Sequence, residues 1–146
     1  MRLLRLLAVI VALAALSVGA LQAQDENVLV VGHAESTDSL DPARGYTQTT
    51  GIINHVTYDT LVTFPSDSAA SIEPLLAESW TVSDDGLTYT FTLRAGAVFA
   101  SGDPLTAADV AYSINRVKNV KGNPSSLTAN IAGAEATDDA TVVITL

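Results

Sequence analysis

The chain has 146 residues, no cysteine and a net charge of −9 at pH 7, from 16 acidic and 7 basic residues. Without cysteine there is neither a disulfide nor a thiol nucleophile. An acidic surface repels nucleic acid and anionic membranes, so we expect no nucleic-acid partner.

The first 23 residues are predicted to be a secretory signal peptide. Arg2 and Arg5 precede an unbroken apolar run over 6–16, and small residues follow. Cleavage after Ala20 or after Ala23 fits this pattern. The alternative is an uncleaved membrane anchor, but a span needs about 20 apolar residues, and this run is shorter.

We therefore expect a mature domain over 24–146, exported to the periplasm. A lipid anchor needs a cysteine just after the signal, so the protein is predicted not to be a lipoprotein. Removal of the two signal arginines leaves 5 basic residues against 16 acidic ones, a net charge of −11. Such a composition favours a soluble, solvated surface.

The first part of the mature chain indicates a strand, a loop and a helix. Residues 27–32 are mostly apolar and predict a short buried strand. Residues 35–46 are rich in Ser and Asp and predict a loop. A helix is then indicated by the spacing of Ile52, Ile53, Val56 and Leu61, and a surface loop is expected at 66–71.

The alternation after residue 80 predicts a β-hairpin. Trp80 and Val82 alternate with polar residues, and so do Leu87, Tyr89, Phe91 and Leu93 in the following run. A period of two places one side-chain set on a buried face, so all four residues of the second run are expected there. Gly86 supplies the positive φ of the turn, and Trp80 is expected in the core.

A short third strand at 98–99 and a tight turn lead to a second helix. Thr106 and Asp109 have the spacing of a capping box. The apolar face is Val110, Ala111, Ile114 and Val117, and the basic C-terminal end carries Arg116, Lys118 and Lys121. Gly122 and Pro124 are predicted to stop the helix, with a turn over 122–126.

Residues 131–137 and 141–146 predict a second hairpin about Asp138 and Asp139. The sequence ends inside an apolar strand with nothing after it, and an uncovered strand of this kind is an aggregation hazard. We therefore expect a fragment of a longer protein. The predicted fold class is α+β, with β-hairpins and two helices.

Residues that could carry catalysis are few. His33 and His55 are the only histidines, and neither has an acidic neighbour at metal-ligand spacing. The acidic pair before Gly86 lacks the spaced ligands of a calcium loop. No nucleophile motif is present. We expect no enzyme activity, no metal and no cofactor.

Four motifs in order carry a family resemblance. They are Leu-Asp-Pro at 40–42, Tyr-Asp-Thr-Leu-Val at 58–62, Pro-Leu-Leu-Ala-Glu-Ser-Trp at 74–80 and the block over 85–109. From about Val28 to Leu146 the chain resembles the extracytoplasmic solute-binding proteins, family 5, of ABC importers. These include oligopeptide-, dipeptide- and nickel-binding proteins.

The resemblance implies a two-lobed, monomeric protein that closes on a peptide or related small solute. It also implies ABC permease and ATPase subunits as partners. This chain would supply the N-terminal part, and the position after Leu-Asp-Pro assigns ligand contacts to Tyr46 and Thr47. Some peptide-binding relatives carry an acid there and an aromatic near Leu127, and this chain carries neither. The alternative function is a secreted β-rich interaction or adhesion domain without a small-molecule ligand.

Overall fold

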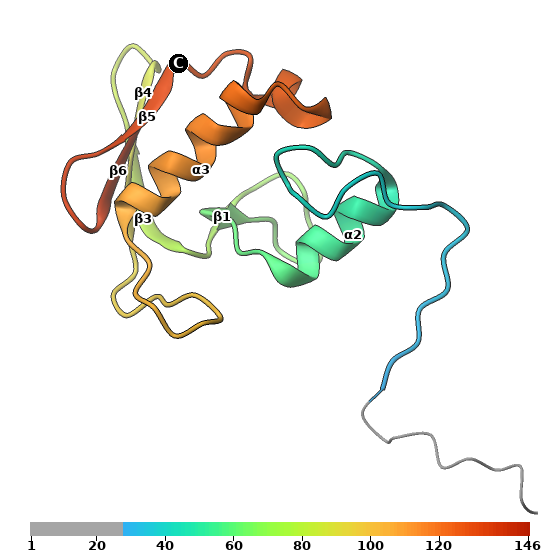
Figure 1. Cartoon of the computed structure of the whole chain (residues 1–146). Coiled ribbons are helices and arrows are strands. Elements are labelled where there is room, and N and C mark those ends of the chain that lie inside the picture. Colours follow the sequence, from blue (N-terminus) through green and yellow to red (C-terminus); the bar gives the residue numbers. More distant parts are fainter. Residues whose placement is uncertain (1–27) are drawn as a thin grey trace, which may run out of the picture. The chain divides into compact units, whose positions relative to one another are not determined.

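The computed structural model describes residues 28–146, and the predicted signal peptide lies outside them (Figure 1). The described part is a mixed α+β fold, as predicted. Its elements in chain order are α2 Gln48–Thr57, β1 Val62–Thr63, β2 Glu73–Pro74, β3 Ala77–Val82, β4 Thr88–Leu93, α3 Ala107–Val120, the 3-10 helix η2 Asn123–Thr128, β5 Gly133–Ala136 and β6 Thr141–Thr145. Within residues 28–146, no helix has the length and apolar character to cross a membrane.

Both predicted hairpins are present and join into one antiparallel sheet. Its strand order is β3-β4-β6-β5, so β6 lies between β4 and β5 and is hydrogen-bonded on both sides. The expectation of an uncovered last strand is therefore wrong. Val142 in β6 is fully buried, because β4 and β5 flank it within the sheet and α3 covers the face of β6.

The second strand of the first hairpin follows the predicted alternation except at its start, whereas Val82 in β3 is 46% exposed and does not join a buried face. Trp80 of β3 pairs with Phe91 of β4, and their ring centroids lie 6.3 Å apart. Phe91 is buried and Trp80 half-buried. Leu87 does not join the buried face: it is 50% exposed, because it belongs to the turn. Its N–H donates to the Asp85 carboxylate (3.0 Å), and Gly86 has the expected positive φ of 72°.

Helix α3 lies across one face of the sheet, next to β5 and β6 (Figure 1). The Asp109 carboxylate accepts from the Thr106 backbone N–H (2.9 Å), as expected of the acid in a capping box. The Thr106 hydroxyl also donates to this carboxylate (2.7 Å). Asn115 bonds both backbone groups of Ala134 in β5. The core between α3 and the sheet comprises Leu93, Ala107, Val110 and Val142.

Helix α3 ends where Lys121 adopts a left-handed conformation, with φ 53°. The predicted turn over 122–126 is instead the 3-10 helix η2, which starts with Pro124 near its first position. Proline suits a helix start because its φ is already fixed near the helical value. The expected third strand is a single bridge between Val98 and Pro104.

The N-terminal predictions were less accurate. Residues 28–32 form no strand, and the side chains of Val28 and Val31 are exposed; Asn27 lies outside the described residues. An apolar run does not supply the paired neighbour that a strand backbone requires. Helix α2 is present but runs from Gln48 to Thr57, earlier than the apolar spacing indicated, because Thr47 caps it. Leu61 lies beyond it and packs against the core.

Candidate functional site

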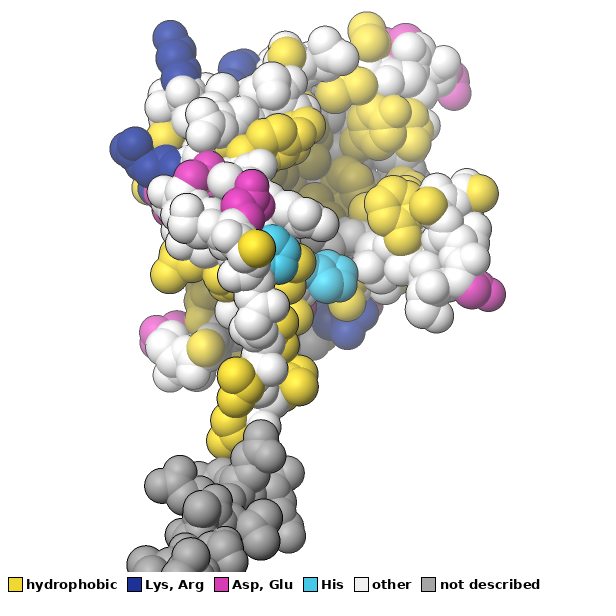
Figure 2. Space-filling model, turned by 90° about the vertical axis from the view of Figure 1, so that its right-hand side faces the viewer, with side chains coloured by type: hydrophobic (Ala, Val, Ile, Leu, Met, Phe, Trp, Pro, Cys, Tyr) yellow, Lys and Arg dark blue, Asp and Glu magenta, His cyan; other side chains and the backbone are white. Residues whose placement is uncertain are grey.

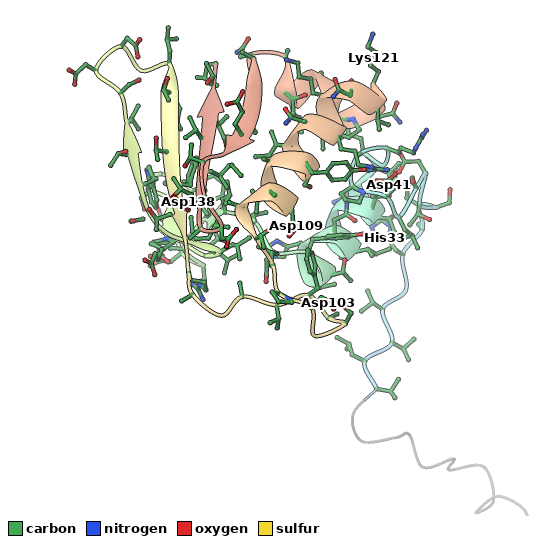
Figure 3. All side chains as sticks on the ribbon, turned by 60° about the vertical axis from the view of Figure 1, so that its left-hand side comes forward. His33, Asp41, Asp103, Asp109, Lys121 and Asp138 are labelled. Carbon is green, nitrogen blue, oxygen red and sulfur yellow. The ribbon has the colours of Figure 1, made fainter. Side chains whose placement is uncertain are left out.

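The loop containing Leu-Asp-Pro is anchored by Asp41. Its carboxylate accepts from Nη1 and Nη2 of Arg116, both at 2.7 Å, and from the Ala43 N–H at 3.0 Å. Figure 3 shows Asp41 beside α3, which carries Arg116. The Arg116 hydrogen bonds are the main cause that lowers the pKa of Asp41 to about 2. The ion pair between Asp41 of the loop and Arg116 of α3 thereby fixes the loop to the helix.

A second carboxylate, Asp38, lies at the first turn of α2. It accepts from the Tyr46 N–H (2.9 Å), the Ser39 N–H (2.9 Å), the Thr50 hydroxyl (2.8 Å) and the Asn123 side-chain amide (3.3 Å). The Tyr46 N–H is the largest of the causes that hold the pKa of Asp38 well below its ordinary value. A negative charge also complements the positive N-terminal end of a helix.

The predicted ligand contacts Tyr46 and Thr47 follow this anchored loop. The Tyr46 side chain is 57% exposed. Thr47 is half-buried and is the N-cap of α2, where its hydroxyl oxygen accepts from the Thr50 N–H (3.3 Å). The two residues are neighbours at one helix end, but neither lines the large cavity described next.

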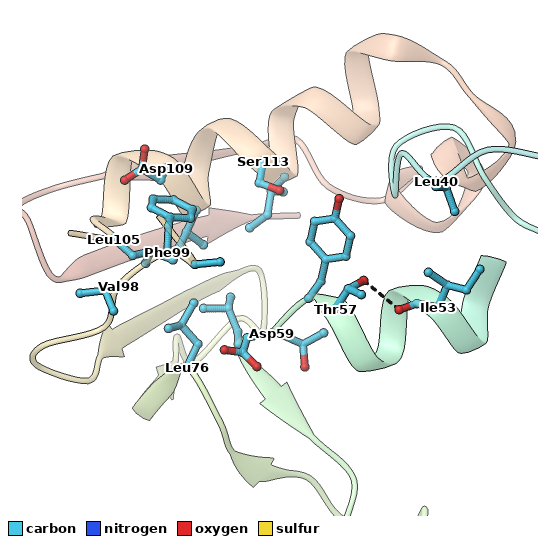
Figure 4. Close-up of a pocket in the computed structure, with 16 residues that line it drawn as sticks. Leu40, Ile53, Thr57, Asp59, Leu76, Val98, Phe99, Leu105, Asp109 and Ser113 are labelled. Carbon is cyan, nitrogen blue, oxygen red and sulfur yellow. Dashed lines mark hydrogen bonds between the residues drawn. The ribbon is translucent and has the colours of Figure 1, made fainter. Parts of the chain in front are cut away.

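An apolar cavity of about 810 Å³ lies between the end of α2, the loop at 98–100 and α3 (Figure 4). The space-filling view shows hydrophobic side chains gathered around a hollow (Figure 2). Four large side chains of the lining remain substantially exposed: Leu40, Tyr58, Val98 and Phe99. Sequence reasoning missed this cavity, because it treated Val98 and Phe99 only as a short strand.

Some polar groups of the cavity are engaged in hydrogen bonds within the protein. The Thr57 hydroxyl donates to the Ile53 carbonyl (2.8 Å; Figure 4), and the Asp109 carboxylate accepts from Thr106. Specific recognition of a polar ligand needs free, convergent polar groups. The Asp59 carboxylate and the Ser113 hydroxyl also line the cavity, so its mostly apolar wall includes polar groups as well.

In the described part of the chain, the fold does not group the two histidines with acidic side chains in an arrangement that could bind a metal ion. Nδ1 of His33 lies 2.7 Å from the Thr49 hydroxyl, and His55 is exposed on α2. Within residues 28–146, no three His, Cys, Asp or Glu side chains are grouped so that they could hold a metal ion.

Comparison with known proteins assigns the family. Residues 71–146 match the family described as "Bacterial extracellular solute-binding proteins, family 5 Middle". This match covers more than half of the chain and includes both hairpins and α3. The chain belongs to this family, which consists of solute-binding proteins and not of enzymes.

Relatives differ in what their names say they bind. The chain is 33% identical over 124 residues to the probable D,D-dipeptide-binding periplasmic protein DdpA of Escherichia coli K12, covering 83% of this chain and 24% of DdpA. It is 45% identical over 85 residues to the glutathione-binding protein GsiB of Salmonella typhimurium, covering 57% of this chain and 17% of GsiB.

The fold is also similar to a solved structure, MoaA of A. tumefaciens R10 in complex with mannopinic acid. The TM-score is 0.63 at 36% identity, covering 73% of this chain and 22% of MoaA. The chain thus spans about a quarter or less of the length of these relatives.

Proposed function

We propose that this chain is the N-terminal part of the substrate-binding component of an ABC importer. The whole protein would capture a peptide or related small solute in the periplasm and deliver it to a membrane permease that ATPase subunits drive. The observation that carries the proposal is the family match over 71–146, together with relatives named for binding a D,D-dipeptide and glutathione.

The domain boundaries are part of the proposal: a signal peptide over 1–23 and an incomplete binding domain over 24–146. The coverage of about a quarter of each relative supports a longer parent protein with a second lobe. The apolar cavity supports it as well. Exposed apolar patches of this kind mark a ligand-binding groove or a surface that another protein or domain covers.

Binding would work by lobe closure without covalent chemistry. A ligand favours the closed state only if it makes contacts there that the open state lacks. Tyr46 and Thr47 are the proposed contacts on this side of the cleft. A loop held by two carboxylates is already ordered before the ligand arrives, which lowers the entropic cost of binding.

The test compares two proteins: the chain over 24–146 and the full-length protein encoded by the reading frame that contains it. Calorimetry is performed with a D,D-dipeptide, glutathione and a tripeptide of L-residues. We expect one of these probes to bind the full protein with micromolar affinity. The same probe should bind the chain over 24–146 at least about a hundredfold more weakly, because one side of the cleft leaves most of the ligand surface exposed to solvent. Failure of the full protein to bind any of the three, or equal binding by the chain alone, contradicts the proposal.

Export is tested separately. Mass spectrometry of periplasmic extract is expected to show a mature N-terminus at Leu21 or Gln24, since Arg2, Arg5 and the run over 6–16 have the build of a cleavable signal. A membrane-bound product that retains Met1 contradicts the periplasmic assignment. The same extract, run on a sizing column, is expected to contain the protein as a monomer.

A further inference from the structure

One side chain, Asp38, connects three separate parts of the chain. Its carboxylate accepts from the backbone N–H of Tyr46, from the hydroxyl of Thr50 in the first turn of α2, and from the amide of Asn123 in η2. Asn123 is 85 positions further along the sequence. No other carboxylate within residues 28–146 accepts hydrogen bonds from both α2 and η2.

These contacts fix the segment that bears the proposed ligand contacts. Thr50 is fully buried, and its hydroxyl lies within hydrogen-bonding distance of Asp38 (2.8 Å) and of the Ser39 carbonyl (3.0 Å). The Thr47 hydroxyl also lies 3.3 Å from Asp38. The backbone at Tyr46 and the side chain at Thr47 therefore take their directions from the same carboxylate.

Close backbone packing leaves this loop little room to adjust. A Cβ on Gly45 would lie 2.5 Å from both the Ser39 carbonyl oxygen and Cγ2 of Thr50. Such a distance is far shorter than an ordinary van der Waals contact. The same Cβ would lie 3.1 Å from the Asp38 carboxylate, so Gly45 packs against the groups that Asp38 holds. A change at Asp38 is therefore expected to alter the backbone at Tyr46, whose N–H donates to that carboxylate.

We propose that Asp38 is a positioning residue for the ligand site, which orients Tyr46 and Thr47 without touching the ligand itself. The inference rests on the proposed function of those two residues. It separates two roles: Asp41 anchors the loop to α3 through Arg116, whereas Asp38 sets the geometry at the N-terminal end of α2. Pre-orienting the contacts in this way adds affinity without a new contact.

The first test needs no ligand. In Asp38→Asn the side chain keeps its size but loses its charge, so its hydrogen bond from the Tyr46 N–H weakens. Amide hydrogen exchange followed by NMR on the purified protein is expected to show faster exchange of the Tyr46 N–H, by about tenfold. The amides of β4 and β6 should keep their rates. Unchanged exchange at Tyr46 would overturn the inference.

The matched control is Asp85→Asn. Asp85 likewise accepts from a neighbouring hydroxyl, Ser83, and from a backbone N–H, Leu87, but in the hairpin turn between β3 and β4. It should speed exchange at Leu87 and leave Tyr46 unchanged. If Asp38→Asn lowers the stability of the whole fold, Asn123→Ala removes only the exposed amide contact, and it too should speed exchange at Tyr46 while leaving the sheet intact.

The second test uses the full reading frame with a D,D-dipeptide and glutathione as probes. Asp38→Asn should weaken binding of whichever probe binds by about tenfold, Asp38→Glu should recover part of the loss, and Asp85→Asn should have no effect. Equal losses in Asp38→Asn and Asp85→Asn would overturn the positioning role. If neither probe binds, the result counts against the proposed function, and the exchange test decides the role of Asp38 by itself.

Discussion

Asp41 in the Leu-Asp-Pro loop and Arg116 on α3, 75 positions apart in sequence, form a two-pronged ion pair with both N–O distances at 2.7 Å. Both side chains are about one-third exposed or less. The sequence pattern placed Arg116 near the C-terminal end of a helix, where the negative end of the macrodipole favours a positive charge. The structure shows that Arg116 instead joins the helix to the loop that precedes the proposed ligand contacts.

Replacing Arg116 by Lys tests whether the shape of this pair matters as well as its charge. Lysine is a point charge and cannot place two parallel N–H groups on one carboxylate. Arg116→Lys is therefore expected to lower the thermal unfolding midpoint measured by circular dichroism. Arg94→Lys is the control, because Arg94 is exposed and forms no ion pair within residues 28–146. Equal midpoints for the two variants would show that only the charge counts.

The same carboxylates predict how stability depends on pH. The pKa values of Asp38 and Asp41 are lowered in the folded state, that of Asp41 to about 2. A lowered folded-state pKa contributes stability that is present above the ordinary value near 3.8 and is lost as pH falls through the folded value. The unfolding midpoint should therefore fall steeply between about pH 4 and pH 2.

In Asp41→Asn one of these titrating groups is absent. Its midpoint should be lower than that of the unchanged protein near neutral pH and should approach it at about pH 2. A constant difference between the two proteins from pH 6 down to pH 2 would show that the contribution of Asp41 does not depend on its charge.

Gly122 packs closely against the backbone of the Leu-Asp-Pro loop, and this contact predicts a steric effect of substitution. A Cβ at this position would lie 2.3 Å from the Ala43 carbonyl oxygen and 2.8 Å from Cα of Arg44, and both are backbone atoms that cannot rotate away. Gly122→Ala is expected to lower the free energy of unfolding by about 1–3 kcal/mol. Gly51→Ala is the control: a Cβ there meets nothing within 4 Å, and alanine in a helix should add about 0.5–1 kcal/mol. Similar changes in unfolding free energy for both variants would mean that Gly122 and the loop at Ala43 are loosely packed.

Phe91 and Leu87 test the register of the first hairpin. Phe91 is 8% exposed and packs beside Trp80, so Phe91→Ala should cost about 3–5 kcal/mol of unfolding free energy in a urea titration. Leu87→Ala should change it by about 0.5 kcal/mol or less, as expected for an exposed site. A large loss at Leu87 would place this residue on the buried face after all.

The contrast between the two halves of the chain shows what a sequence pattern can predict. The hairpins and α3 were predictable because their signals are local: alternation around Phe91, a turn glycine at Gly86 and an acid three residues after Thr106. The start of α2 was not, because it depends on Thr47 and on contacts from Asp38. The apolar run over 28–32 was assigned a strand from composition alone, which contains no information about a pairing partner.

The candidate site was proposed only through the family resemblance. Nothing in the spacing around Tyr46 indicates that Asp38 and Asn123 meet beneath it, since they are 85 positions apart. The Leu-Asp-Pro motif marks the loop, and the Asp41–Arg116 pair gives a physical reason for its aspartate. Sequence periodicity detects buried faces, whereas this loop is held by charged hydrogen bonds that leave no periodic signal.

The final prediction concerns Tyr46 itself. In the full reading frame, Tyr46→Ala is expected to weaken binding of the responsive probe by about tenfold, or about 1.4 kcal/mol, because an exposed aromatic on a pre-ordered loop offers contact area at little entropic cost. The unfolding midpoint should stay within about 2 °C, since the side chain is 57% exposed and supports no core. Leu87→Ala, on an exposed apolar side chain of the hairpin turn between β3 and β4, is the control and should leave the affinity unchanged. Full affinity in Tyr46→Ala would remove this residue from the ligand site and leave the cleft to be sought elsewhere in the protein.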